Sequence, residues 1–210
     1  MKQLLKPTAA LLLFFSCTDR PAANRPAAVV TPLQKDSGAV LQNGANPYAT
    51  VDVSPMDIAY FPVDYPIKKM AQPGMPPPLA RVVYSRPHKQ GRTIFGSLLK
   101  FGEHWRLGAN EATELELFQT ATIQNKKVAR GRYILYSIPQ RDHWTIIFNS
   151  NLYSWGLKQD AAGDLYRFDI PVEKVATPVE FYTMVFQKTS TGADLLMAWD
   201  DVAAKLPITF

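Results

Sequence analysis

The feature that most constrains the fold is a series of short segments after Pro78 in which apolar and polar residues alternate. Alternation with a period of two is typical of strands that bury one face, and Pro, Gly, Asn or Asp closes each segment. The longest stretch without this pattern, 85–113, holds one helical candidate, a turn or two at 93–99. We therefore predict an all-β fold for residues 79–210, a single antiparallel β-sandwich of jelly-roll type with one short helical turn. About nine strands are expected, at 81–85, 113–119, 122–128, 133–138, 143–149, 165–171, 179–187, 195–199 and 205–210, and Asn125 and Lys126 suggest that 122–128 is a tight hairpin.

Residues 1–16 have the layout of a bacterial lipoprotein signal peptide. Lys2 and Lys6 precede a short apolar run at 9–15, and Ser16 stands directly before Cys17, the single cysteine of the chain. The run is too short to cross a bilayer, which needs about 20 residues. We expect export to the cell envelope, with a lipid anchor at Cys17 that holds the chain at a membrane. The expected location is the periplasm or the outer membrane. An ordinary signal peptide or an unmodified cysteine is the alternative.

The next two segments differ in composition. Residues 17–50 are rich in Ala, Pro, Gly, Asn and Gln and lack apolar periodicity, which predicts a disordered tether. Residues 51–78 carry many large apolar side chains, so we expect an extended, proline-rich arm that packs on the domain. Prolines at 55, 62 and 66 exclude a central strand or a helix interior there. Eleven of the 17 prolines lie between Pro21 and Pro78, which places the domain boundary near Pro78.

Charge and spacing argue against several classes of function. The net charge is +5, and without Lys2 and Lys6 the balance is 21 basic to 18 acidic residues, or +3, with no clustered basic run. No nucleic-acid partner is therefore expected. The three histidines, His88, His104 and His143, lack the spacing of a metal site, and no cofactor motif is present, so we expect neither metal nor cofactor.

The candidate site lies in the stretch between Trp105 and Thr113 and includes the preceding His104. A Gly-Ala pair before Asn110 predicts a turn that presents polar side chains. Arg106 can offer a planar fork to an anion, and Trp105 an apolar face to a ring or peptide. The alternative is that Arg106 pairs with Glu111 or Glu103 to brace the loop while Trp105 fills the core. A second aromatic spot, Trp155, could join the site. The ligand-binding candidates are therefore His104, Trp105, Arg106, Asn110, Glu111 and Trp155.

These residues favour a non-catalytic binding module for a polar ligand, either a glycan or a peptide. A hydrolase that uses Glu111 and His104 as acid and base is a second hypothesis, because a carboxyl and an imidazole can share proton transfer. A third is a structural scaffold whose aromatic arm, 56–67, recruits another protein. No nucleophile motif accompanies any serine, so an enzyme is the less favoured class.

One ordered set of residues extends through the predicted domain and comprises Ser85, Arg86, Pro87, Gly91, Arg92, Ile94, Phe95, Gly96, Trp105, Arg106, Gly108 to Thr113, Gly131, Tyr133, Ile138, Pro139, Trp144, Ile147, Asn149, Trp155, Gly156, Val179, Glu180 and Trp199. In this set the chain resembles the DUF2911 family, secreted or lipoprotein-like bacterial proteins of unknown function. The resemblance extends over about 56–210 and implies export, an envelope location and one β-rich domain. It implies no activity, cofactor or catalytic residue.

Overall fold

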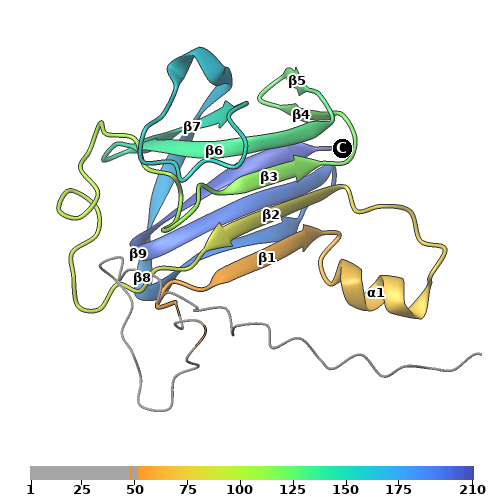
Figure 1. Cartoon of the computed structure of the whole chain (residues 1–210), viewed down its shortest axis with the longest axis horizontal. Coiled ribbons are helices and arrows are strands. Elements are labelled where there is room, and N and C mark those ends of the chain that lie inside the picture. Colours follow the sequence, from red (N-terminus) through yellow and green to blue (C-terminus); the bar gives the residue numbers. More distant parts are fainter. Residues whose placement is uncertain (1–47, 49–51) are drawn as a thin grey trace, which may run out of the picture. The chain divides into compact units, whose positions relative to one another are not determined.

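The described residues form one open, nine-stranded antiparallel sheet with one short α-helix (Figure 1). A computed structural model describes Tyr48 and residues 52–210. The strand order is β1-β2-β3-β6-β7-β8-β9-β4-β5. The elements are β1 (Met56–Phe61), α1 (Tyr65–Ala71), β2 (Ala80–Ser85), β3 (Glu114–Leu117), β4 (Ala121–Ile123), β5 (Lys126–Val128), β6 (Gly131–Pro139), β7 (His143–Asn149), a 3-10 turn (Ala161–Gly163), β8 (Asp164–Lys188) and β9 (Gly192–Thr209).

The two C-terminal strands are long and irregular, and each replaces two of the predicted strands. The first part of β8 pairs with β7, and its later part pairs with β9. The β8–β9 register shifts between Lys174 and Thr183, a stretch that contains Pro178. Proline lacks the N–H that a regular ladder requires, so regular pairing is interrupted at this point. In β9, Asp200 has a φ of 53° and lies opposite the irregular stretch.

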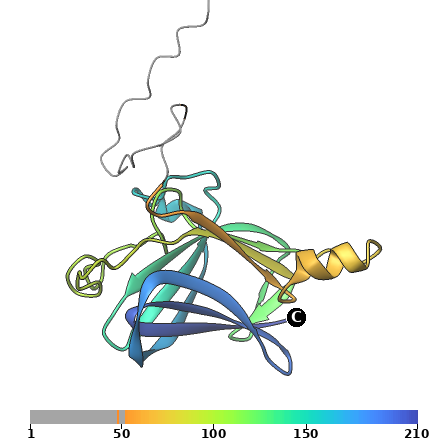
Figure 2. The ribbon, with the colours of Figure 1, turned by 90° about the horizontal axis from the view of Figure 1, so that it is seen from below.

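The sheet curls around a main core, with a second, smaller apolar cluster at Ala112, Ile134, Tyr136 and Ile147. Its two ends remain unpaired at β1 and β5 within the described residues. Figure 2 shows the β8–β9 pair across the core from the orange and yellow strands β1 and β2. The chain after β2 approaches β8, where the Lys89 N–H donates to the Glu180 carbonyl at 2.7 Å. The prediction of antiparallel β structure is confirmed. All nine strands belong to one open sheet, so the structure does not show the predicted sandwich or jelly roll.

The segment before β2 contains a strand and a helix. β1 is an edge strand that pairs with β2 from Met56 opposite Ser85 to Phe61 opposite Ala80. Pro66 occupies the first turn of α1, where its missing N–H costs no helical hydrogen bond. Phe61 is buried, whereas the second half of α1 exposes its Met70. The helix of this fold is thus at 65–71, and residues 93–99, where a helical turn was expected, form turns.

The predicted signal peptide, Cys17 and all of the tether except Tyr48 lie outside the described residues. In the part of the chain that the structure describes, no helix has the length and apolar character needed to cross a membrane.

Candidate functional site

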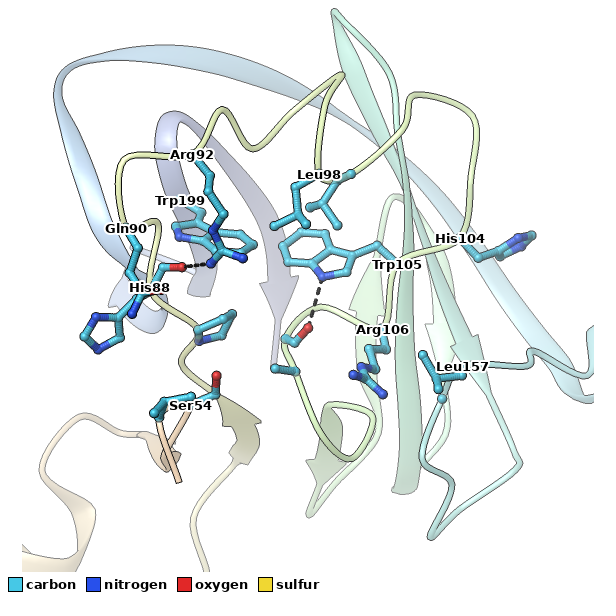
Figure 3. A pocket seen from close by; sticks show the side chains of 16 residues that line it. Ser54, His88, Gln90, Arg92, Leu98, His104, Trp105, Arg106, Leu157 and Trp199 are labelled. Carbon is cyan, nitrogen blue, oxygen red and sulfur yellow. Dashed lines mark hydrogen bonds between the residues drawn. The ribbon is translucent and has the colours of Figure 1, made fainter. Parts of the chain in front are cut away.

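A pocket of about 430 Å³ opens beside the loop that the sequence singles out (Figure 3). Four parts of the chain meet there: the segment before β1, the long connection between β2 and β3, the loop after β7, and β9. The pocket is lined by Val53, Ser54, Pro87, His88, Gln90, Arg92, Leu98, Leu99, His104, Trp105, Arg106, Gly108, Ala109, Gly156, Leu157 and Trp199. Its volume lies at the lower end of the range for small-ligand sites, about 300–1,000 Å³.

The floor of the pocket is aromatic and tightly held. Trp105 is only 6% exposed, and its backbone exchanges two hydrogen bonds with Ser137 of β6, at 2.8 and 2.7 Å. The Trp105 indole N–H donates to the Gly108 carbonyl at 3.2 Å, and the ring stacks on Trp199 at 6.0 Å between centroids. The ring of Trp144 meets Trp105 edge to face at 5.7 Å. Trp105 therefore anchors the loop in the core and offers the pocket only a small part of its surface.

Arg106 forms the next wall, supported by the loop after β7. One Nη1–H of Arg106 donates to the Trp155 carbonyl at 2.8 Å, and the guanidinium lies 5.7 Å from the centroid of the Trp155 ring. The pKa of Arg106 is lowered overall, because partial burial disfavours the charged form and outweighs the opposing effects of Glu111 and Tyr136. Trp155 is half exposed and does not line the pocket; it supports Arg106 from outside.

Gly156 allows this support because the two loops touch at its α-carbon. An added Cβ would lie 2.7 Å from the Ala112 Cβ and 3.0 Å from the Arg106 Cβ. The Gly156 φ of 79° is also in the region that side chains avoid. A hydrogen bond from the Ala112 N–H to the Ser154 carbonyl, 3.0 Å long, closes the contact. Glycine at this position therefore sets how closely the loop after β7 can approach Arg106.

Asn110 holds a different wall in place. Its φ of 58° turns the backbone, and its side-chain amide donates to the Asp52 carboxylate and, at 3.4 Å, to the Ser54 carbonyl. Val53 and Ser54 line the pocket. Asn110 thus fixes the segment that precedes β1 but does not itself line the pocket.

His104 and Glu111 do not come together in the pocket. His104 is exposed at the rim, and in Figure 3 its ring points away from Trp105. Glu111 is exposed and is absent from the lining. Among the described residues, Arg106 forms no ion pair with Glu111 or Glu103, so the predicted bracing pair is not the contact that holds this loop.

A family model matches residues 71–208 of the chain, and its description is DUF2911, protein of unknown function. The chain belongs to the DUF2911 family. The match begins within α1, so β1 and the segment with Val53 and Ser54 lie before it. No curated protein and no solved structure matches the chain.

Sequence reasoning missed three contributors to the site of this DUF2911 chain. Arg92 was not among the ligand-binding candidates, yet it lines the pocket opposite Arg106 (Figure 3). Trp199 reaches the same floor from β9, and Leu157 closes the rim from the loop after β7. No local pattern joins Trp199 to Trp105, because only the curl of the sheet brings them together.

An ion pair holds the loop that carries Arg92. The Lys89 ammonium lies 3.1 Å from the Asp200 carboxylate, and the same carboxylate accepts the Ile94 N–H at 3.2 Å. Asp200 is 8% exposed and belongs to β9, one residue after Trp199. This carboxylate therefore ties the connection after β2 to the strand that forms the pocket floor. Nowhere in 52–210 do three or more His, Cys, Asp or Glu side chains gather as a possible metal site.

Proposed function

We propose that this DUF2911 chain is an exported, lipid-anchored binding module of the cell envelope, without catalytic activity, whose pocket at Trp105 and Arg106 binds a polar ligand, a glycan or a peptide. The observation that carries the proposal is the pocket itself. It combines a rigid aromatic floor with convergent guanidinium groups, the combination that specific ligand sites use. The absence of Glu111 from the lining gives no support to a hydrolase built on Glu111 and His104.

Binding at this pocket is tested with two exposed leucines. Leu157 is 75% exposed and lines the pocket, whereas Leu165, 53% exposed, lies on β8 outside the lining. Alanine at either position leaves the core untouched, so both variants should fold. We expect Leu157→Ala to weaken binding of short peptides or oligosaccharides in calorimetric titrations, and Leu165→Ala to bind like wild type. Equal affinities for the two variants and wild type would place the ligand elsewhere.

The anchor is tested separately. The sequence around Cys17 supports lipid modification. The proposed tether would connect this anchor to the domain that carries the pocket. Cells fed a radiolabelled fatty acid should incorporate label into the wild-type chain and not into Cys17→Ala. Equal incorporation by the two chains, or none by wild type, would remove the lipid anchor from the proposal.

A further inference from the structure

The pocket has an unbalanced charge. Two guanidinium groups line it, Arg92 from the connection after β2 and Arg106 from the segment before β3, and Figure 3 shows them on opposite sides of Trp105. Neither Asp nor Glu is among the lining residues. Guanidinium groups remain charged at any physiological pH, so the pocket is a cationic cavity that lacks a counter-ion from its own walls.

Arg106 has no ion-pair partner among the described residues, although the charge of Glu111 acts on it from outside the lining. Arg106 is half buried, and burial lowers its pKa because desolvation disfavours the charged form. Its hydrogen bond goes to a backbone carbonyl, that of Trp155, and no carboxylate pairs with it among the described residues. A guanidinium has five N–H donors in a planar fork. Donors of Arg106 are therefore left for a ligand.

Arg92 repeats this pattern on the opposite wall. Its Nε–H donates to the Lys89 carbonyl at 2.8 Å, and its Nη2–H donates to the His88 carbonyl. These bonds hold the side chain in place without neutralising it. In contrast, the arginines on the strands pair with acids: Arg81 with Glu116 at 2.5 Å, for example. Four arginines of the described residues form such pairs, Arg81, Arg86, Arg132 and Arg167, and none of them lines the pocket.

A large part of the remaining lining is aliphatic and would suit an apolar side chain. Its aliphatic members include Leu98, Leu99, Leu157 and Pro87. Trp105 is 6% exposed, so it gives little of the flat open ring face on which a sugar would stack. The side-chain acceptors of the lining are neutral ones, those of Ser54, Gln90 and the histidines, so the two guanidinium groups are its strongest polar groups and favour an anion. A carboxylate joined to an apolar group fits these walls better than a neutral glycan does.

We propose that the pocket binds the carboxyl end of a peptide whose last side chain is apolar. The terminal carboxylate bonds to the free donors of Arg106, with Arg92 adding charge from the other side, and the last side chain contacts the leucines. Capture of a terminal carboxylate is a known mode of peptide recognition, and bidentate pairing with arginine gives it direction. This inference rests on the proposed binding function and narrows it to one ligand class.

The test compares two peptides and two arginine variants of the full-length chain in detergent. The peptides are N-acetyl-Ala-Ala-Leu with a free carboxylate and the same peptide with a carboxamide. We expect the acid peptide to bind in calorimetric titrations and the amide peptide to bind roughly tenfold to a hundredfold more weakly. Arg106→Gln should lower the affinity for the acid peptide by about the same factor. Added salt should weaken binding of the acid peptide and leave binding of the amide peptide unchanged.

Arg130→Gln is the matched control because it removes the same charge elsewhere. Arg130 is exposed and precedes β6, roughly 20 Å along that strand from Ser137, the partner of Trp105. It should bind the acid like wild type. If Arg106→Gln unfolds, Arg92→Gln, at an exposed position, carries the comparison.

The outcomes separate this inference from the function on which it rests. Recognition of the carboxylate is contradicted if the acid and the amide peptide bind equally well. It is also contradicted if Arg106→Gln and Arg130→Gln lose the same affinity for the acid peptide. A disaccharide that contains glucuronate is a further probe. If it binds and depends on Arg106 while the acid peptide does not bind, the ligand is not a peptide, but the proposed binding function stands. The same conclusion follows if a neutral disaccharide alone binds. Failure of every probe to bind contradicts both.

Discussion

Replacing Gly156 by alanine should destabilise the domain by more than backbone strain alone, because the new methyl group would collide with the segment that carries Arg106. The added Cβ would lie 2.7 Å from the Ala112 Cβ, 3.0 Å from the Arg106 Cβ and 3.3 Å from the Ala112 Cα. Those contacts are too short to persist, so one loop must move. Overpacking of this kind costs about 1–3 kcal/mol.

Gly91→Ala measures the strain without the collision. Gly91 has a φ of 70°, close to the 79° of Gly156, but its added Cβ would meet nothing within 4 Å. A left-handed alanine costs about 1–2 kcal/mol. The lower entropy of the unfolded chain returns about 0.4–1 kcal/mol. We therefore expect Gly91→Ala to lose about 1 kcal/mol of unfolding free energy and Gly156→Ala about 2–4 kcal/mol.

Urea unfolding followed by far-ultraviolet circular dichroism gives the two free energies by linear extrapolation. The slopes with denaturant should match that of wild type, since neither change alters the surface exposed on unfolding. Gly156→Ala should also weaken binding of the acid peptide, because Arg106 moves with the loop, and Gly91→Ala should not. Free energies that agree to within about 0.5 kcal/mol would refute the close contact between the two loops.

Three further changes test the packing around the pocket and the loops that flank it. Trp105→Ala removes a buried ring and should cost about 3–5 kcal/mol in urea unfolding; a loss under about 1 kcal/mol would contradict the anchoring role. Asp200→Ala leaves Lys89 without its partner and should lower stability by about 1–3 kcal/mol, with the double change Lys89→Met/Asp200→Ala recovering part of it; additive losses would contradict a coupled pair. For Asp164, burial raises the pKa, but hydrogen bonds, first among them the one from Asn149, lower it by a larger amount, so the net shift of the pKa is downward. The stability from this shift is present above roughly pH 4 and is lost as pH falls through the lowered pKa; Asp164→Asn should therefore be less stable than wild type at neutral pH and approach it in acid, and a gap that does not narrow would contradict the shift.

The strands were predictable where one face is buried. In β3, Leu115 and Leu117 are buried, and Glu116 on the other face pairs with Arg81. Alternation of this kind is a local property, so the sequence reports it directly. β1 was missed because it is an edge strand that leaves its Ile58 about half exposed, and its flanking prolines suggest a chain without regular pairing.

The site was predictable only in part, because local sequence shows which residues could bind but not which of them meet. One alternative paired Arg106 with Glu111 or Glu103, yet its side chain donates to the Trp155 carbonyl, 49 positions away. Trp199 is 94 residues from Trp105 and joins it only because β9 crosses the core. Such contacts depend on strand order and on the curl of the sheet, and neither follows from the periodicity of single strands.

The measurement that tests the pocket most directly is a titration followed through the indole N–H signals in a nitrogen-15 NMR spectrum. The chain has four tryptophans, and single Trp→Phe variants assign their signals. Trp105 and Trp199 line the pocket, whereas Trp144 does not. Adding N-acetyl-Ala-Ala-Leu with a free carboxylate should shift the signals of Trp105 and Trp199 and leave that of Trp144 in place. Unchanged Trp105 and Trp199 signals, or a shift confined to Trp144, would contradict a ligand site at this pocket.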